Sequence, residues 1–214
     1  MFPVRPPLVL RSFYRNVVWQ MPAGQKVLYL TFDDGPIPEI TPWVINQLRE
    51  FNAKATFFCL GENIKKHTNE FEMLIKEGHA TGNHTMNHFN GWVTHDFRYI
   101  RNVEICQSVL VKHRGQQEHD VADLFRPPYG KITFSQVKAL KRKYKIIMWD
   151  VLSFDYDKTK SGEQCYRNVQ QYAKPGSIIV FHDSKKAEER LRYALPRVLQ
   201  YFTEKGYEFK SLQF

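Results

Sequence analysis

Two adjacent carboxylates lie in the stretch Thr31 to Pro36, directly after an apolar run of strand-forming residues at 27–30. Neighbouring side chains on a strand point to opposite faces, so Asp33 and Asp34 are not expected to share one task. Ionised carboxylates at the edge of an apolar core need a cation, an arginine or a metal to offset their desolvation. Asp-Gly-Pro is also ordinary turn chemistry, so these six residues alone leave a turn and a reactive site equally open.

Two histidines, His84 and His88, are four residues apart. On a single helical turn both imidazoles would face the same way and could bind one metal, although such pairs also arise by chance. One aspartate with two histidines would leave open coordination positions, which is typical of a catalytic metal site that activates water. One carboxylate of the first pair would then remain as a general base.

Two more polar residues follow apolar runs. Arg126 precedes a Pro-Pro turn and could keep the basic carboxylate ionised, since an opposite charge lowers the pKa of an aspartate. His182 ends the last long apolar run and could act as a general acid, oriented by Asp155 or Asp183. Taken singly, Arg126 could equally be a surface arginine and His182 a structural histidine. Their common position after predicted strands favours a shared site.

The elements that must position these residues alternate between strands and helices. Strands are predicted at 27–30, 55–60, 79–82, 124–125, 146–149, 177–181 and 207–212. Helices are predicted at 41–51, 63–77, 96–114, 133–144, 162–173 and 187–205, the first with Thr41 as N-cap and Pro42 at its first position.

This alternation favours parallel pairing, because each crossover has room for a helix. An open doubly wound sheet and a closed barrel both satisfy the count. The polar residues cluster after the strands, as in a barrel whose active site is assembled from several strand ends. We therefore expect an α/β fold, a single-domain, irregular (distorted) (β/α)7-type barrel with the active site at the C-terminal ends of its strands.

Composition narrows the possible classes of function. The chain has 214 residues, 43% of them hydrophobic, which fits one globular domain with a sizeable core. Its formal charge of +9 would suit an anionic partner. Lysine and arginine are scattered, with short clusters only at 141–143 and 185–186, so we expect a basic surface and no nucleic-acid module.

The cysteines and the N-terminal sequence bear on the compartment. Cys59, Cys106 and Cys165 are odd in number and form no CxxC, which predicts reduced, partly buried thiols. The apolar stretch at 7–10 is too short for a signal-peptide core or a membrane span. We expect a soluble, cytoplasmic protein without stable membrane insertion, although a chain trimmed of an export signal would look the same. The oligomeric state is not indicated.

Five segments together resemble the ordered motifs of the polysaccharide deacetylase family, that is, the NodB-homology domain of carbohydrate esterase family 4. The resemblance covers residues 25–214 as the catalytic domain and leaves 1–24 as an irregular lead-in that packs on it. The first three segments are highly specific in combination, and the fourth is degraded. They are Thr31 to Pro36, His84 to His88, Arg126 to Gly130, Trp149 to Asp157 and Val180 to Asp183.

The resemblance implies a metal-dependent hydrolase that removes N-acetyl groups from a GlcNAc-type glycan or oligosaccharide. It implies one divalent metal ion, Zn²⁺ by preference, although Co²⁺ or Ni²⁺ would suit the same ligands. The resemblance implies that Asp33 is the general base, held by Arg126, and that Asp34, His84 and His88 are the metal ligands. It implies that His182 is the general acid, tuned by Asp155, and that the backbone N–H of Tyr129 stabilises the oxyanion. The rings that would contact the substrate are those of Tyr129, Trp149 and Tyr156.

The sequence departs from the family pattern in the fourth segment. Leu152 stands where many members have an aspartate, and Tyr156 follows Asp155 where a tryptophan is usual. If Leu152 replaces the tuning carboxylate, Asp155 must take over or His182 loses its partner. Outside the motifs, His79 is expected to support its strand. Trp92 and His95 could line a substrate groove, or could pack within a loop.

Two other functions stay open at this point. The same domain also serves hydrolases of small non-sugar amides or formamides, for which a closed pocket would be expected in place of an open groove with exposed rings. The basic charge also allows a glycan- or nucleic-acid-binding protein with a vestigial site. The full set of acid, base and ligand candidates argues against that third reading.

Overall fold

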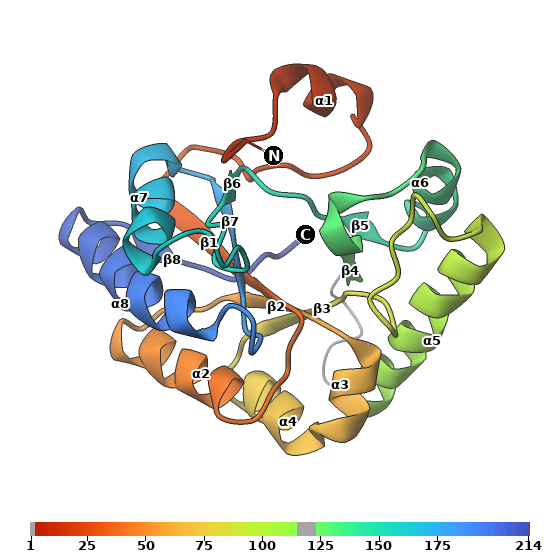
Figure 1. Cartoon of the computed structure of the whole chain (residues 1–214), viewed down its shortest axis with the longest axis horizontal. Helices are drawn as coiled ribbons and strands as arrows, with labels where there is room; N and C mark the ends of the chain where they lie inside the picture. The colour runs from red at the N-terminus through yellow and green to blue at the C-terminus, as the bar shows by residue number, and fades with distance from the viewer. Residues whose placement is uncertain (1–2, 115–122) are drawn as a thin grey trace.

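A curled sheet of parallel strands forms the centre of the molecule, and helices cover its outer side (Figure 1). The computed structural model describes residues 3–114 and 123–214. Its strands are β1 (Val27–Asp33), β2 (Thr56–Cys59), β3 (Ala80–Asn83), β4 (Leu124–Phe125), β5 (Lys145–Ile146), β6 (Val151–Leu152), β7 (Ile178–His182) and β8 (Glu208–Phe209). The order is β5-β4-β3-β2-β1-β7-β6, and β8 pairs with the start of β1. The expected distorted α/β barrel is therefore confirmed.

The strand register brings the polar segments together. Asp33, the last residue of β1, pairs with His182 on β7 and with Phe58 on β2. Asn83, which precedes His84, pairs with Phe125, which precedes Arg126. Because all these pairs are parallel, the side chains that follow the strands emerge at the same edge of the sheet.

The helices follow the predicted pattern with three differences, one being that the helix expected at 133–144 already ends at Leu140. They are α2 (Ile40–Glu50), α3 (Gly61–Lys66), α4 (Thr68–Lys76), α5 (Asp96–Arg114), α6 (Phe134–Leu140), α7 (Gly162–Tyr172) and α8 (Glu188–Glu204). The single helix expected at 63–77 is divided at His67, which separates α3 from α4. The predicted N-cap at Thr41 was wrong, because α2 already begins at Ile40 and the Thr41 hydroxyl donates to Asp183.

The strand expected at 146–149 was also wrong in its bounds. Pairing along β5 stops at Ile146, and a separate strand, β6, begins at Val151. Between them the N–H of Met148 donates to the carbonyl of Val18, and that of Asp150 donates to the carbonyl of Ile178. This segment therefore passes from one end of the sheet to the other.

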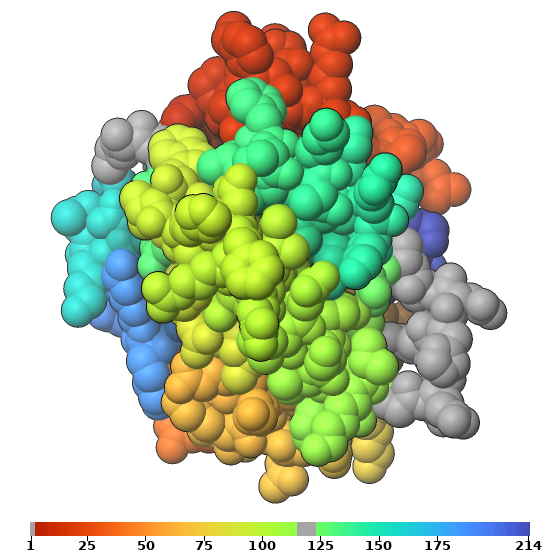
Figure 2. Space-filling view, turned by 90° about the vertical axis from the view of Figure 1, so that its right-hand side faces the viewer, coloured from red at the N-terminus to blue at the C-terminus, as the bar shows by residue number. Residues whose placement is uncertain are grey.

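The lead-in lies across the gap between β5 and β6. It contains a short helix, α1 (Leu8–Phe13), where we expected only irregular chain. The N–H of Leu152 donates to the carbonyl of Val4, and the Tyr14 hydroxyl donates to the carbonyl of Ile132. Figure 2 shows the lead-in, in red, directly against the green segment that contains α6. The lead-in thus fills part of the wall that the sheet leaves incomplete.

A buried carboxylate ties this lead-in to the sheet. Asp150 is fully buried, and Arg5 and Arg11 reach it at 2.8 and 2.6 Å. The Ser177 hydroxyl donates to its second oxygen at 2.6 Å. Removing a partner from such a buried group is costly, so these contacts fix the lead-in strongly.

The core lies between the sheet and the helices. The rings of Phe32, Phe57 and Phe181, on neighbouring strands, stack at centroid distances of 4.9 and 6.1 Å. All three cysteines are buried and free, which confirms the expected reduced thiols. Among the described residues, no helix is both long enough and apolar enough to span a membrane.

Candidate active site

The two carboxylates of β1 point to different partners. Asp33 ends the strand, is buried, and its Oδ1 lies 2.7 Å from Nη1 of Arg126. Asp34 leaves the strand with a φ of 83°, a left-handed conformation that non-glycine residues rarely adopt. This backbone turn carries the Asp34 carboxylate toward the two histidines. Non-glycine residues held in this region cost free energy and cluster at functional sites.

Arg126 is fully buried, which excludes the surface position that the sequence left open. Besides Asp33, its guanidinium donates to the Thr31 hydroxyl at 2.7 Å and to the Met148 carbonyl at 2.9 Å. It also lies over the ring of Phe58, 4.2 Å from the centroid. Burial lowers the pKa of Arg126 and Asp33 partly offsets this, but arginine keeps its charge in proteins. Arg126 therefore fixes the Asp33 carboxylate from the buried side of the site.

His84 and His88 lie on a loop after β3, not on the helical turn that their spacing suggested. Thr85 and His88 have φ values of 68° and 57°, so the chain cannot be helical there. Two side-chain amides hold the loop: Asn83 accepts from the N–H of Thr85 at 2.9 Å, and Asn102 accepts from that of Met86 at 2.9 Å. The imidazoles still lie together, with centroids 5.2 Å apart.

Asp34, His84 and His88 form a compact cluster of potential metal ligands, with one ligand atom from each within 4.8 Å of the others. Asp34 Oδ1 lies 3.7 Å from His84 Nε2 and 3.3 Å from His88 Nε2. This buried oxygen has no hydrogen-bond partner among the described residues. An orphaned carboxylate oxygen facing two imidazole nitrogens fits a divalent cation.

The protonation of the cluster suits that use. Burial lowers the pKa of His84 to about 4, so it is neutral at neutral pH. Its Nδ1 lies 2.8 Å from the carbonyl of Arg126, which leaves Nε2 free to face Asp34. Burial raises the pKa of Asp34, but the close approach of His88 and the charges of the nearby histidines more than offset this, leaving that pKa well below its usual range.

His182 stands on the other side of the site and is held by Asp155. Its Nδ1 lies 2.7 Å from Asp155 Oδ1, and its backbone N–H donates to Asp155 Oδ2 at 2.7 Å. Burial alone would lower the pKa of His182. The charges of Asp155 and, less strongly, of Asp34 and Asp33 raise it by more than that, so the net pKa is about 9. The imidazole is therefore protonated at neutral pH and can donate a proton.

Asp183, the other carboxylate considered for His182, has a different set of contacts. Its Oδ1 accepts from the N–H of Gly35 at 3.0 Å, and its Oδ2 accepts from the Thr41 hydroxyl at 2.6 Å. Its own N–H donates to the carbonyl of Asp33. Asp183 therefore braces the turn after β1 and does not orient the imidazole.

The missing carboxylate at Leu152 does not leave His182 without a partner. Leu152 lines the pocket as an apolar residue, while Phe154, with a φ of 66°, bends the chain toward Asp155. The backbone carbonyl of Asp155 accepts from Nε of Arg190 at 2.6 Å, which holds this bend in place. Asp155 thus reaches His182 from three residues beyond the position where an aspartate is usual.

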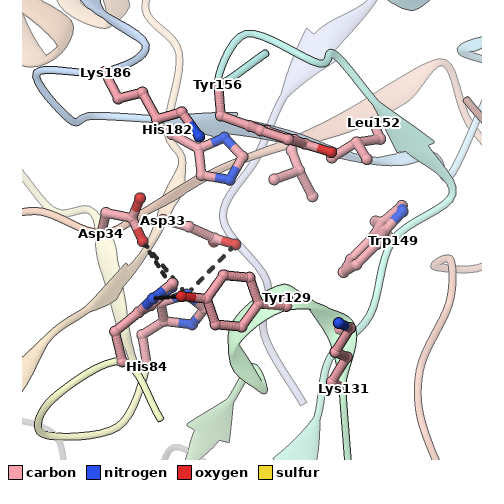
Figure 3. A pocket seen from close by; sticks show the side chains of 13 residues that line it. Asp33, Asp34, His84, Tyr129, Lys131, Trp149, Leu152, Tyr156, His182 and Lys186 are labelled. Carbon is pink, nitrogen blue, oxygen red and sulfur yellow. Dashed lines mark hydrogen bonds and ion pairs between the residues drawn. The ribbon is translucent and has the colours of Figure 1, made fainter. Parts of the chain in front are cut away.

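These side chains open into one pocket of about 330 Å³, shown in Figure 3. The expected rings of Tyr129, Trp149 and Tyr156 line it, and Tyr129 is 54% exposed. Tyr129 lies on a 3-10 turn at Pro128–Gly130 with a φ of 60°, and its hydroxyl is 3.0 Å from His88 Nδ1. Arg126 and Asp155 lie behind the lining and act on it through Asp33 and His182.

Some residues fall outside the pocket, and others were missed. His79 accepts from the N–H of Ala55 and supports the sheet, as expected, while Trp92 and His95 do not line the pocket. Lys131 and Lys186 also line it, although the sequence singled out neither as a site residue and Lys186 only as part of a short basic cluster. Lys131 directly follows the Arg126 segment and Lys186 is four residues after His182, so proximity to a motif was the only available signal.

Comparisons with known proteins agree with this geometry. A family model described as "Polysaccharide deacetylase" matches residues 20–145. A peptidoglycan-N-acetylglucosamine deacetylase of Bacillus cereus is 32% identical over 198 residues, which cover 92% of this chain and 91% of that protein. A chitooligosaccharide deacetylase of Azorhizobium caulinodans is 33% identical over 170 residues, with 78% of each chain covered.

A solved structure extends the similarity to the fold. The crystal structure of a peptidoglycan N-acetylglucosamine deacetylase superimposes with a TM-score of 0.86 at 31% identity, covering 96% of this chain and 94% of that one. The sequence resemblance is therefore confirmed over nearly the whole chain. The chain belongs to the polysaccharide deacetylase family.

Proposed function

We propose that this protein is a metal-dependent hydrolase that removes N-acetyl groups from a GlcNAc-type glycan or oligosaccharide. The observation that carries the proposal is the division of the two β1 carboxylates. Asp33 is held by buried Arg126, while the unpartnered Oδ1 of Asp34 faces His84 and His88. The relatives named above are deacetylases of peptidoglycan or of chitooligosaccharides, which supports a glycan substrate.

Asp34, His84 and His88 would hold the metal. Zinc suits two imidazoles and a carboxylate, and cobalt or nickel would also fit these ligands. When bound, such an ion supplies Lewis-acid polarisation of the acetyl carbonyl and lowers the pKa of the attacking water. The hydroxyl of Tyr129, 3.0 Å from His88 Nδ1, would fix the orientation of the His88 imidazole.

The proton transfers would be divided between the two sides of the pocket. Asp33, paired with buried Arg126 at 2.7 Å, would accept the proton of the attacking water. His182, kept protonated by Asp155, would donate a proton to the leaving amine. The backbone N–H of Tyr129 would contribute to stabilising the oxyanion. Trp149 and Tyr156, with the Tyr129 ring, would contact the sugar.

The rim of the pocket favours a glycan over a small amide. The Tyr129 ring is about half exposed, and the side chains of Asp34 and His88 keep 24% and 27% of their surface accessible. A chain of sugars could therefore pass the reactive groups without being enclosed. We take residues 25–214 as the catalytic domain, with 1–24 as the lead-in that packs on it through Asp150.

The test is acetate release from N-acetylglucosamine oligomers and from peptidoglycan fragments. We expect release that a chelator abolishes and that added Zn²⁺ restores. Asp33→Asn should keep the metal and lose about 10²- to 10⁴-fold in kcat, the usual contribution of a general base. Glu72→Gln, a matched amide substitution at an exposed acid, should change neither. Metal-loaded protein that releases no acetate from any of these glycans would refute the substrate assignment.

A further inference from the structure

Two lysines flank the pocket, and neither belongs to the acid, base or ligand set. Lys131 and Lys186 both line it, and Figure 3 shows them on opposite sides, Lys186 beside His182 and Lys131 beside Tyr129. They come from different segments, the turn after β4 and the loop after β7. The reactive groups thus lie between two ammonium groups.

Aromatic rings, not carboxylates, hold these ammonium groups. Lys131 Nζ lies 5.3 Å from the centroid of Trp92 and 6.0 Å from that of Tyr129. Lys186 Nζ lies 5.5 Å from the centroid of Tyr156. Within residues 3–114 and 123–214, neither lysine has a carboxylate within ion-pair distance. Cation–π contacts orient an ammonium without neutralising it, and Asp157, whose pKa Lys186 helps to lower, lies beyond ion-pair distance of that lysine.

The charge balance of the pocket adds to this. The two lysines of the lining equal Asp33 and Asp34 in number of charges, and behind the lining the charge of Arg126 equals that of Asp155. A divalent ion on the Asp34 cluster would therefore make the occupied pocket positive. A positive concave site concentrates anionic ligands and strengthens their binding.

We infer that the pocket selects N-acetylated glycans that carry a carboxylate on the sugar next to the one that is deacetylated. This rests on the proposed function. With the acetyl group at the Asp34 cluster, the adjoining sugars pass the rim, where Lys131 and Lys186 lie. A carboxylate there forms charge-assisted hydrogen bonds with an ammonium, whereas a neutral sugar offers only hydroxyls. The carboxylate could be an ether-linked substituent or a uronic acid.

Three tetrasaccharides separate charge from shape. They are alternating N-acetylglucosamine and N-acetylmuramic acid, the methyl ester of that compound, and N-acetylglucosamine alone. We expect the zinc-loaded enzyme to have a higher kcat/KM for the acid than for the ester, mainly through KM. We call the kcat/KM for the acid divided by that for the ester the acid-to-ester ratio. This ratio should fall in 0.5 M salt, because salt screens the charges at the rim. A tetrasaccharide with glucuronate in place of the muramic acid tells the two carboxylate sources apart.

Substitutions test which residues bind the substrate carboxylate. Lys131→Gln and Lys186→Gln should each lower the acid-to-ester ratio roughly two- to fivefold, the range for exposed ion pairs, and both together by about tenfold. Lys131→Arg and Lys186→Arg should retain the ratio, and Lys138→Gln, at an exposed lysine on α6, should not alter it. Calorimetric binding of the intact acid and ester to zinc-loaded Asp33→Asn should show the same preference without turnover.

The outcomes separate the two proposals. An acid-to-ester ratio of one, or a ratio that both lysine variants leave unchanged, would overturn the charge selection even if all substrates are deacetylated. Absence of acetate release from every substrate, with acid still bound more tightly than ester by the Asp33→Asn protein, would instead remove the proposed reaction and keep the anion site.

Discussion

The two sides of the pocket are built differently. On the side of the proposed metal site, Asp33, Asp34, His84 and His88 stand at the positions that the resemblance assigns, and a fully buried arginine holds Asp33. On the leaving-group side, the motif is degraded at Leu152, yet His182 has a carboxylate at 2.7 Å. One side keeps every motif residue, whereas the other departs from the pattern at Leu152 and Tyr156 and keeps the contact between Asp155 and His182.

The difference follows from what each side must provide. A metal site needs several ligand atoms in one small volume, and left-handed backbone at Asp34 and His88 brings their side chains and that of His84 into such a volume. A general acid of the histidine type needs one carboxylate beside its second ring nitrogen, which is a single contact. Asp155 illustrates the second case.

The largest effect is expected from removing a metal ligand. His84→Ala should abolish metal binding and lower kcat/KM by at least about three orders of magnitude, because several kcal/mol of transition-state stabilisation would be lost. Elemental analysis of the purified variant, together with acetate release, measures both effects. His95→Ala, a histidine outside the pocket, is the control, and an active, metal-free His84→Ala protein would disprove the assignment.

The next largest effect concerns the buried pair beneath the metal side. Arg126→Met leaves Asp33 without its cation and should lower the free energy of unfolding by about 3–5 kcal/mol, as for other broken buried pairs. Adding Asp33→Asn should recover part of this loss. Urea unfolding measures it, and Arg49→Met, which breaks an exposed pair with Glu77, should cost less than about 1 kcal/mol. Equal losses in both variants would contradict a special role for Arg126.

On the leaving-group side we expect a change in pH dependence. Asp155→Asn removes the strongest interaction that raises the pKa of His182, so this pKa should fall from about 9. A general acid must be protonated, and activity is lost as pH rises through its pKa, so the alkaline limb of kcat/KM should move to lower pH by about one to two units.

Turnover of Asp155→Asn at pH 7 should also fall, by about 10- to 100-fold, since the imidazole loses its orienting partner. The profile is measured from pH 6 to 10 with a single glycan. Glu189→Gln, a nearby exposed acid, should leave the alkaline limb in place. An unshifted limb in Asp155→Asn would mean that His182 is not the group that titrates.

The smallest effect is expected at the degraded position itself. Leu152→Asn should raise the activation barrier by less than about 1 kcal/mol, a rate change of fivefold or less, because Asp155 already occupies His182 Nδ1. Single-turnover rates with Leu152→Asn and the conservative control Leu152→Met measure this. A large gain in Leu152→Asp would show instead that Asp155 is an inadequate substitute.

Much of the site could be predicted from the sequence because it depends on residue type and order. Polar residues after apolar strands predicted a parallel barrel with its site at the strand ends, and parallel register does bring Asp33 beside His182. The Asp33–Arg126 contact followed from the need to neutralise a buried carboxylate. These inferences needed only the side-chain chemistry and the alternation of elements.

Other features were decided by the tertiary structure alone. Spacing suggested a helical turn for His84 and His88, but the amide side chains of Asn83 and of Asn102, on α5, hold them on a loop. Only loop geometry could choose Asp155 over Asp183 for His182, since both are aspartates close to it in the predicted site. Lys131 and Lys186 are ordinary surface residues in sequence, and they became candidates for substrate recognition because folding places them on one pocket. Such contacts join distant segments, and no local pattern encodes them.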